Sequence, residues 1–392
     1  MISVYEAKQL IAEATIPSPV KKVQLKDAFG FILAKDVVAQ TDIPNFAQSS
    51  MDGYAIRFED SEMPLEIIGE MAAGTSIRLS IGAGQATRIF TGAPLPDGAD
   101  TVVMQEKVGR RGNALTIADA NVTQGLNVRP KGAECREGET AMEKGTYLSA
   151  AALGFLAGIG CVQVSIFGSP SIAVILTGNE LQQPGQPLEF GQVYEANSVS
   201  LGSALRKSGM QIAEIFLAED QPEKLKEVMA LALEQHDVVL LNGGVSVGDY
   251  DFVVGSAEAC GVVQQFHKIK QKPGKPLYFG TKANKLVFGL PGNPSSALTC
   301  FYEYVLPALE KMLQKENTVK ETRAILTHNY AKPSGLTHFV KAFYTNGNVT
   351  PLHAQESFRL HSFAQANCFI VLEESSAGSK AGDFVNVHLL PI

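Results

Sequence analysis

Between residues 171 and 244, short apolar runs alternate with longer amphipathic stretches, and this alternation constrains the fold more than any other feature. The apolar runs are residues 171–178, 211–220 and 236–244, and the stretches between them have helical periodicity. Strands that recur about every 30 residues with helices between them predict a parallel sheet with right-handed crossovers. The sequence therefore predicts an α/β domain.

Capping signals delimit the helices of this domain. Gly209 ends the first helix, and Asp220 stands at the N-cap position of the second. Further along, residues 275–292 predict a hairpin, after which Asn293 and Pro294 open a final helix.

The rest of the chain predicts further domains, so the expected fold class is multidomain α/β plus β. Short strand-like runs between glycine and proline turns predict an all-β segment. This segment interrupts the first domain, and each of the two parts of that domain contains a predicted helix, one capped by Ser3 and the other by Ser149. The expected domains are a discontinuous N-terminal α+β domain (1–45 with 141–170), an inserted β domain (46–140), the α/β domain (171–313) and a small C-terminal β-barrel or sandwich (314–392).

Charge and apolar content exclude several classes of protein. A formal net charge of −7 argues against a general nucleic-acid binder, because such proteins neutralise phosphates with Lys and Arg. No apolar run approaches the ~18 residues of a membrane span, and the amphipathic N-terminus lacks the features of a signal peptide, so we expect a cytoplasmic protein without a membrane partner. The five cysteines lack metal-ligand spacing, so neither zinc nor a disulfide framework is expected.

Turns rich in Gly, Ser, Thr, Asn and acidic residues follow the predicted strands, at the sheet edge where parallel sheets bind ligands. Four turns share this position: residues 176–180, 218–220, 242–251 and 289–294. The third contains Gly243, Gly244, Ser246 and Gly248, so its backbone N–H groups can surround an anion, although it has neither a Walker A nor a GxGxxG pattern. We expect the four turns to form one phosphate-binding rim.

Acidic residues lie in the same turns: Glu180, Asp220, Asp249 and Asp251. Because carboxylates repel phosphates unless a cation intervenes, these acids predict Mg²⁺, which takes a few carboxylate oxygens and completes its shell with phosphate and water. The alternatives are that Asp220 only caps a helix and that Asp249 is an exposed turn residue.

A lysine cluster follows in the sequence. Lys268, Lys270 and Lys272 alternate, so one face of a strand would carry three ammonium groups, and a Pro–Gly turn would hold Lys275 near Lys272. The cluster predicts a site for a dianion such as phosphate or an oxometalate, with a solvated basic edge as the alternative.

Six segments together resemble the molybdopterin molybdenumtransferase family, which includes bacterial MoeA and the E-domains of gephyrin and of a plant relative. The segments are SSMDGYA (49–55), TGAPLPDGAD (91–100), LTGNEL (176–181), GGVSVGDYDF (243–252), KPGKP (272–276) and GLPGNPSSA (289–297). The resemblance runs in order from the first helix to the C-terminus.

The resemblance implies a reaction and an assembly. Family members insert molybdenum from molybdate into adenylylated molybdopterin and release AMP, with Mg²⁺ as cofactor. They are homodimers whose active sites are shared between subunits, and other proteins of molybdenum cofactor biosynthesis would be further partners.

The resemblance also implies roles for single residues. Asp220 and Asp251, with Glu180 assisting, would place Mg²⁺ and support phosphoanhydride cleavage, and Lys272 and Lys275 would bind molybdate. Residues implied to contact the pterin or nucleotide are Thr177, Gly243, Gly244, Ser246, Gly248, Asn293 and Pro294. Outside the α/β domain, the implied contacts are Lys341 and Ser362 on the anion, and Asp52, Thr91 and Glu134 on the partner's site.

The chain departs from the family pattern at three positions. Asn179 and Glu134 each stand where Asp is usual. Lys341 stands where Arg is usual, and a lysine cannot contact an anion in the bidentate manner of an arginine.

Two other functions are compatible with these residues. One is a non-catalytic, dimeric molybdopterin-binding scaffold, against which the intact acidic residues argue. The other is a molybdopterin adenylyltransferase, but those enzymes are typically single α/β domains.

Overall fold

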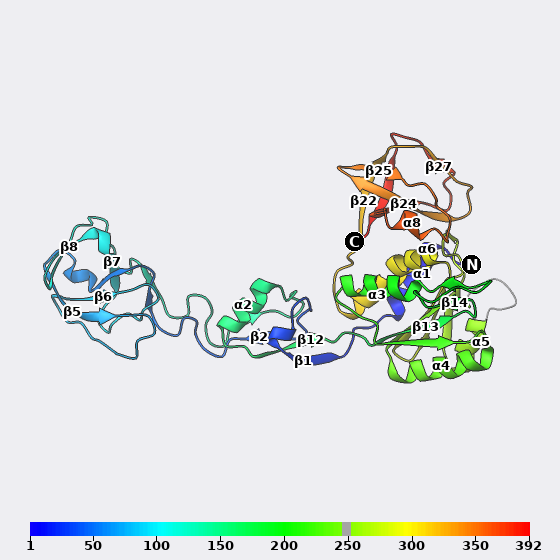
Figure 1. Cartoon of the computed structure of the whole chain (residues 1–392). Helices are drawn as coiled ribbons and strands as arrows, with labels where there is room; N and C mark the ends of the chain where they lie inside the picture. The colour runs from blue at the N-terminus through cyan, green and yellow to red at the C-terminus, as the bar shows by residue number, and fades with distance from the viewer. Residues whose placement is uncertain (245–251) are drawn as a thin grey trace. The chain divides into compact units, whose positions relative to one another are not determined.

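The computed structural model describes residues 1–244 and 252–392, which form two compact units (Figure 1). Unit 1 comprises Met1–Lys21, Gly30–Ile32 and Ile166–Ile392, and unit 2 comprises Lys22–Phe29 and Leu33–Ser165. Within the described residues, no helix is long and apolar enough to cross a membrane. The two units divide the chain differently from the four domains expected from the sequence, because the expected N-terminal domain (1–45 with 141–170) has residues in both units, and the four-domain division stays a prediction.

Unit 1 contains a six-stranded sheet in the order β16-β13-β17-β21-β20-β18. Its parallel strands are β13 (Ile172–Thr177), β16 (Glu214–Ala218), β17 (Val238–Asn242) and β21 (Lys285–Leu290), and the antiparallel ones are β18 (Val263–His267) and β20 (Tyr278–Lys282). Thr177 pairs with Ala218, and Asn242 pairs with both Leu176 and Leu290, so the carboxyl ends of the parallel strands lie at one edge. The predicted parallel sheet and the hairpin β20–β21 are confirmed.

Both faces of this sheet are covered, because its strands are apolar on both sides. Along β13, Val174 and Leu176 belong to a core shared with α1, α3 and the last helix, while Ala173 and Ile175 belong to a core shared with α4 and α5. The helices are α1 (Val4–Ala14), α3 (Asn197–Lys207), α4 (Pro222–Gln235) and α5 (Phe252–Ala259). Burial on both faces is typical of a parallel sheet with crossover helices.

Three helix boundaries test the capping predictions. Ser3 and Glu6 form the predicted capping box at the start of α1, and Gly209, at φ 76°, follows the end of α3 as predicted. The prediction for Asp220 is wrong, because Gln221 is the N-cap residue of α4. Pro222 occupies the first helical turn with its φ already fixed, so the helix begins one residue later than predicted.

The last helix of the α/β domain is continuous from α6 (Pro294–Cys300) through a π-helical turn, η4 (Phe301–Val305), to α7 (Leu306–Met312). Asn293 is its N-cap residue, as predicted. Pro307 accounts for the wide turn, since a proline inside a helix has no N–H to donate and its ring excludes the carbonyl of the residue four positions earlier. That residue is Glu303.

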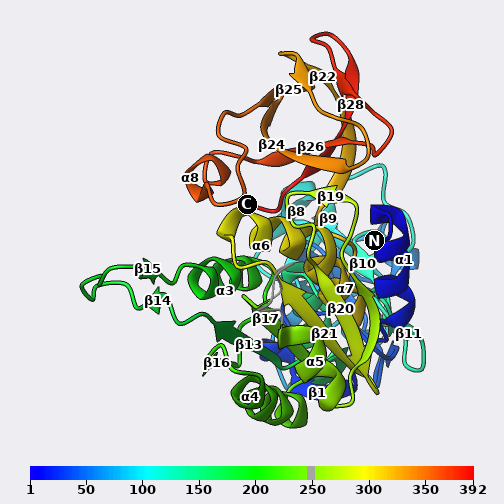
Figure 2. The same cartoon turned by 90° about the vertical axis from the view of Figure 1, so that its right-hand side faces the viewer.

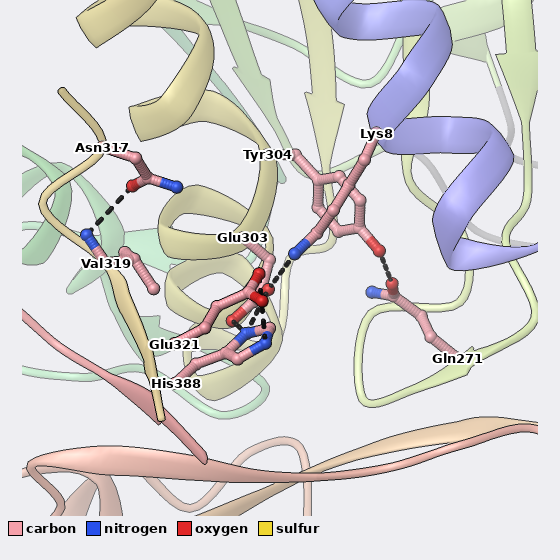
Figure 3. A network of polar contacts seen from close by, with 8 residues as sticks. All are labelled: Lys8, Gln271, Glu303, Tyr304, Asn317, Val319, Glu321 and His388. Atoms are coloured by element: carbon pink, nitrogen blue, oxygen red, sulfur yellow. Dashed lines mark hydrogen bonds and ion pairs between the residues drawn. The ribbon is translucent and has the colours of Figure 1, made fainter. Parts of the chain in front are cut away.

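Glu303 joins three elements of unit 1 through a buried polar network (Figure 3). Its carboxylate accepts a hydrogen bond from Lys8 Nζ of α1 at 2.7 Å and lies 2.9 Å from Nδ1 of His388 in the C-terminal segment. Burial alone would raise the pKa of this carboxyl, but Lys8 and His388 hold it below its usual value. A fully buried carboxylate is stable only when paired in this way.

The C-terminal strands of unit 1 close into a barrel (Figure 2). The ladder runs β24-β25-β22-β28-β26 and returns from β26 to β24. Its strands are β22 (Lys320–Leu326), β24 (Thr337–Thr345), β25 (Asn348–Pro351), β26 (Cys368–Leu372) and β28 (Phe384–Leu389). The predicted β-barrel is confirmed, and a short strand from the α/β region, β19 (Gln271–Lys272), joins β24 in parallel.

Unit 2 contains a second six-stranded sheet, with strand order β7-β4-β6-β5-β9-β8. Its strands are β4 (Gly53–Ile56), β5 (Leu65–Met71), β6 (Gln85–Ile89), β7 (Thr101–Met104), β8 (Val108–Arg111) and β9 (Ala114–Ile117). Shorter ladders pair β1 (Val20–Gln24) with β12 (Gln163–Phe167) and β2 (Val37–Val38) with β11 (Thr140–Met142). In the chain, α2 (Ala150–Gly158) lies between β11 and β12, and it is capped by Ser149 as predicted.

Candidate functional site

The carboxyl ends of the parallel strands in unit 1 border a cleft of about 590 Å³. All four polar turns predicted from the sequence contribute residues to it. Of the predicted site residues, the cleft brings together Thr177, Glu180, Asp220, Gly243, Gly244, Asn293 and Pro294. Ser246, Gly248, Asp249 and Asp251 lie outside the described residues.

Gly243 and Gly244 allow the end of β17 to approach β13 closely. Gly243 has φ 98°, and a Cβ there would lie 2.4 Å from Thr177 O and 2.6 Å from Thr177 Oγ1. Gly244 has φ 63°, and a Cβ there would lie 3.2 Å from the same hydroxyl. Only glycine permits this packing, so the turn presents bare backbone at the cleft.

Two polar atoms in the wall of the cleft have unused hydrogen-bonding capacity. Thr177 Oγ1 and Asn197 Oδ1 are buried and have no hydrogen-bond partner among the described residues. A buried polar group without a partner costs about 1–3 kcal/mol, which a bound ligand would relieve. Both atoms belong to residues that line the cleft, so they are candidate contacts for a polar ligand.

Three acidic residues border the same cleft, Glu180, Asp220 and Glu195, and the carboxylate of Glu195 accepts hydrogen bonds from Ser198 N and Ser198 Oγ. The Glu180 carboxylate lies against the backbone of Gly178, where a Cβ would be 2.8 Å from Oε2, and the Asp220 N–H donates to Asn179 Oδ1 at 3.4 Å. An Asn oxygen accepts this bond as an Asp oxygen would, so the departure at Asn179 preserves the link between the two turns. Among the described residues, no group of three Asp, Glu, His or Cys could hold a metal. The carboxylates of Glu180 and Asp220 nevertheless suit Mg²⁺, which keeps much of its shell for water and phosphate.

A pair of buried amides was missed by sequence reasoning. Asn197 Nδ2 donates to Asn242 Oδ1 at 2.6 Å and to Gly292 O at 2.8 Å, and Asn242 Nδ2 donates to Pro291 O at 3.1 Å. These bonds tie the start of α3 and the end of β17 to the turn before α6. The sequence places Asn242 at the end of a predicted strand, but it contains no signal for the hydrogen bond between Asn242 and a residue 45 positions earlier.

The lysine cluster differs from its prediction. Lys268 has φ 74°, so residues 268–272 do not form one strand, and β19 contains only the last two. Lys270 Nζ pairs with Glu374 Oε1 at 2.8 Å. The predicted face with three ammonium groups is therefore wrong, because a positive φ interrupts the alternation of side chains. Lys272 and Lys275 are both exposed, on either side of the turn at Gly274.

Lys341, in β24, and Ser362, in the short helix α8 (Leu360–Phe363), are buried and point at backbone carbonyls. Lys341 Nζ donates to Ala354 O at 2.9 Å and to Arg359 O at 3.0 Å, and Ser362 Oγ donates to Ala354 O at 2.7 Å. Burial lowers the pKa of the lysine. The two side chains hold the loop that carries Phe358, which lines the cleft. Their contact with an anion stays a prediction.

In unit 2, Asp52 and Thr91 lie together. Asp52 Oδ1 accepts hydrogen bonds from Thr91 N and Thr91 Oγ1, both at 2.8 Å, and these bonds lower the pKa of the carboxyl. Glu134 is exposed, and its N–H donates to Ile43 O at 2.8 Å. An ionised Asp52 is thus held at the surface of unit 2, and its relation to a partner's site stays a prediction.

Three family descriptions match successive parts of the chain. Residues 2–160 match the MoeA N-terminal region (domain I and II), residues 173–311 match the probable molybdopterin binding domain, and residues 323–390 match the MoeA C-terminal region (domain IV). The cleft lies in the part that matches the second description, apart from Phe358.

Similar proteins cover the whole chain. A molybdopterin molybdenumtransferase of Haemophilus influenzae is 32% identical over 404 residues and covers 100% of both chains. One from Staphylococcus epidermidis is 33% identical over 400 residues, which is 99% of this chain and 95% of that one. The crystal structure of a molybdopterin biosynthesis MoeA protein from Pyrococcus horikosii has a TM-score of 0.87 at 31% identity and covers 100% of this chain and 99% of its own, so the two share a fold. The protein therefore belongs to the molybdopterin molybdenumtransferase family.

Proposed function

We propose that the protein inserts molybdenum from molybdate into the dithiolene of adenylylated molybdopterin, with Mg²⁺-dependent release of AMP. One observation carries the proposal: the Thr177 hydroxyl, which has no hydrogen-bond partner among the residues that the structure describes, faces the glycine turn of β17 at the edge where the parallel strands end. The names of the full-length relatives support the transfer of molybdenum to molybdopterin, and the resemblance adds the adenylate, Mg²⁺ and AMP.

The pterin and its adenylate would bind in the cleft. Thr177 Oγ1 can donate to a phosphate oxygen, and backbone N–H groups can approach the same anion at Gly243 and Gly244 because no Cβ intervenes. Asn293 and Pro294 begin the long last helix at the cleft, and a helix N-terminus favours an anion. Asn197 Oδ1 remains as an acceptor for a donor group of the ligand.

The acidic residues would place the metal. We assign Glu180 and Asp220 to one side of the phosphoanhydride, together with Asp251, which the resemblance adds. When bound, Mg²⁺ would neutralise phosphate charge and make AMP a better leaving group. The residues themselves would contribute orientation and charge balance, which dominate the catalysis of such cleavages.

Lys272 and Lys275 would bind molybdate. Both are exposed, and they flank a turn of the chain that ends at Pro276, a residue of the cleft. Two ammonium groups on one short turn suit a dianion, whose charge they match. Molybdate held there would lie beside the pterin cleft.

The proposal includes a cytoplasmic homodimer with a shared site. Support comes from α2 of unit 2, whose sequence AAALGFLAG is apolar on every face although Leu156 is its one buried residue in the described chain. A helix that is apolar all round is normally covered. A second copy of the chain would cover it, and Asp52, Thr91 and Glu134 would then serve the partner's site. Other proteins of molybdenum cofactor biosynthesis would supply the pterin and receive the product.

The test is AMP release by the purified protein. With adenylylated molybdopterin, AMP should appear only when molybdate and Mg²⁺ are both present, and a chelator should stop it. Asp220→Asn should slow release by about 10²-fold, because one group that stabilises the transition state is lost. Glu219→Gln, at an exposed neighbour outside the cleft, is the matched control and should keep the rate. Tight pterin binding without any AMP would instead indicate a scaffold.

A further inference from the structure

Gln271 is a polar residue with a fully buried side chain, placed between two lysines. It begins the segment that we call the lysine turn, residues 271–275. Burying an amide is costly unless each of its groups is hydrogen-bonded, so the partners of Gln271 reveal what the residue does.

Every partner of the Gln271 side chain belongs to the turn or to the helix beneath it. Nε2 donates to Pro273 O at 3.0 Å and to Gly274 O at 3.2 Å, and Oε1 accepts a hydrogen bond from the Tyr304 hydroxyl (Figure 3). Tyr304 is itself buried in the π-helical turn η4. The amide therefore links the backbone of the turn to a fixed point in the core.

Gly274 lets the turn pack tightly on the helix. A Cβ at this position would lie 2.5 Å from Cys300 Sγ and 2.8 Å from Gln271 Nε2, and Gly274 has φ 85°. Cys300 is fully buried in α6. The turn thus rests directly on α6, with the amide of Gln271 beside it.

The barrel holds the other side of the same segment. β19 pairs in parallel with β24, with Gln271 opposite Thr337 and Lys272 opposite His338, and Thr337 N donates to Lys270 O at 2.9 Å. Burial, together with Lys332 and Lys272, lowers the pKa of His338 to about 4. His338 is therefore neutral near pH 7, and the positive charge at this edge comes from lysine.

We propose that Gln271, anchored by Tyr304, is a positioning residue for molybdate, because it fixes the turn from which Lys272 and Lys275 extend. This inference rests on the proposed function of those two lysines. A pair of flexible ammonium groups binds one small dianion well only if their Cα positions are held, since a site must be kept within about 0.5 Å of its productive geometry. Gln271 touches neither anion nor pterin and acts through the turn.

The experiment compares the two substrates in the AMP-release assay. Gln271→Met keeps the volume of the side chain but removes the bonds to Pro273 O, Gly274 O and Tyr304, and Tyr304→Phe removes only the anchoring hydroxyl. Both should raise the KM for molybdate, Gln271→Met by about tenfold, which corresponds to about 1.4 kcal/mol of binding free energy. The KM for adenylylated molybdopterin and the kcat at saturating molybdate should change by less than about twofold, or 0.4 kcal/mol on the same scale.

A matched control comes from the neighbouring residue of the same helical turn. Glu303 faces Lys8 and His388 instead of the lysine turn, so Glu303→Gln should lower the unfolding temperature and leave the molybdate KM unchanged. If Gln271→Met and Tyr304→Phe raise the KM for both substrates equally, in proportion to the stability that each variant loses, the role of Gln271 is merely structural and the inference is overturned.

Lysine variants separate this inference from the proposed function. If Lys272→Met and Lys275→Met raise the molybdate KM while Gln271→Met and Tyr304→Phe do not, the inference alone fails. If the lysine variants also leave the molybdate KM unchanged, the proposed molybdate site fails, and the inference fails with it.

Discussion

Lys341, on the barrel strand β24, has 1% of its surface exposed and has carbonyl oxygens around its ammonium group. The resemblance implies that this position contacts an anion, and Arg is usual there. In this chain the donors of Lys341 are used by the backbone of residues 354–359. The side chain therefore stabilises the loop that carries Phe358 to the cleft, a role that a shorter or uncharged residue could not fill.

Replacing this lysine tests that role at the scale of one residue. Lys341→Met should lower the free energy of unfolding by about 1–3 kcal/mol, because the carbonyls of Ala354 and Arg359 would lose the ammonium donor and keep, among the described residues, only the Ser362 hydroxyl. Urea denaturation followed by circular dichroism measures the change. Lys320→Met, at an exposed barrel position, is the control and should stay within about 0.5 kcal/mol of the wild type. Equal effects of the two substitutions would contradict the structural role.

At the scale of elements, the cleft depends on how closely the ends of β13 and β17 approach. Gly243 makes that approach possible, because a side chain there would overlap the Thr177 carbonyl. The glycine of the turn before α6 is less constrained. A Cβ on Gly292 would lie 3.7 Å from Gly243 Cα, which is ordinary contact.

These two glycines form a matched pair. Gly243→Ala should lower the free energy of unfolding by about 1–3 kcal/mol, because alanine is strained at φ 98° and its Cβ meets a backbone oxygen that cannot move aside. Gly292→Ala, in the same cleft, should have a much smaller effect. Thermal denaturation of both variants provides the comparison, and a larger loss for Gly292→Ala would contradict this account of the turn.

At the scale of the whole molecule, the proposed dimer depends on α2. The exposed residues of this helix are all alanine or glycine: Ala150, Ala151, Gly154, Ala157 and Gly158. A face of small side chains permits another helix to approach closely. Because a Cβ at Gly154 would meet no described atom within 4 Å, the position can be changed without disturbing the fold of the chain.

Gly154→Glu should convert a dimer into a monomer. Glutamate is a better helix former than glycine, so the helix itself should not be weakened, but a buried charge would oppose the proposed contact. Light scattering measures the mass, and AMP release should fall with dissociation because the proposed site is shared between subunits. Gly255→Glu in α5, where a Cβ also meets no described atom, should leave the mass unchanged. A Gly154→Glu variant that stays dimeric would exclude α2 from the interface.

Much of the fold was predictable, because its signals are local. The capping box at Ser3, the end of α3 at Gly209 and the start of α6 at Asn293 each depend on residues within one helical turn. Apolar periodicity likewise indicated the parallel sheet and the barrel. The errors were local as well. Pro222 moved the start of α4 past Asp220, and the positive φ of Lys268 ended the lysine alternation.

By itself, the sequence determined the order of strands and helices, the turns that meet at the carboxyl edge of the sheet and the motifs of the family, because each of these depends on residues that are close together in the chain. The tertiary structure alone decided which polar side chains face the cleft and which are buried to hold it. Gln271 meets Tyr304 across 33 positions, and Lys8 meets Glu303 across 295. Burial and hydrogen bonding between distant segments arise only when the chain has folded, so the pattern of residues could not separate a lysine that binds an anion from one that binds its own backbone.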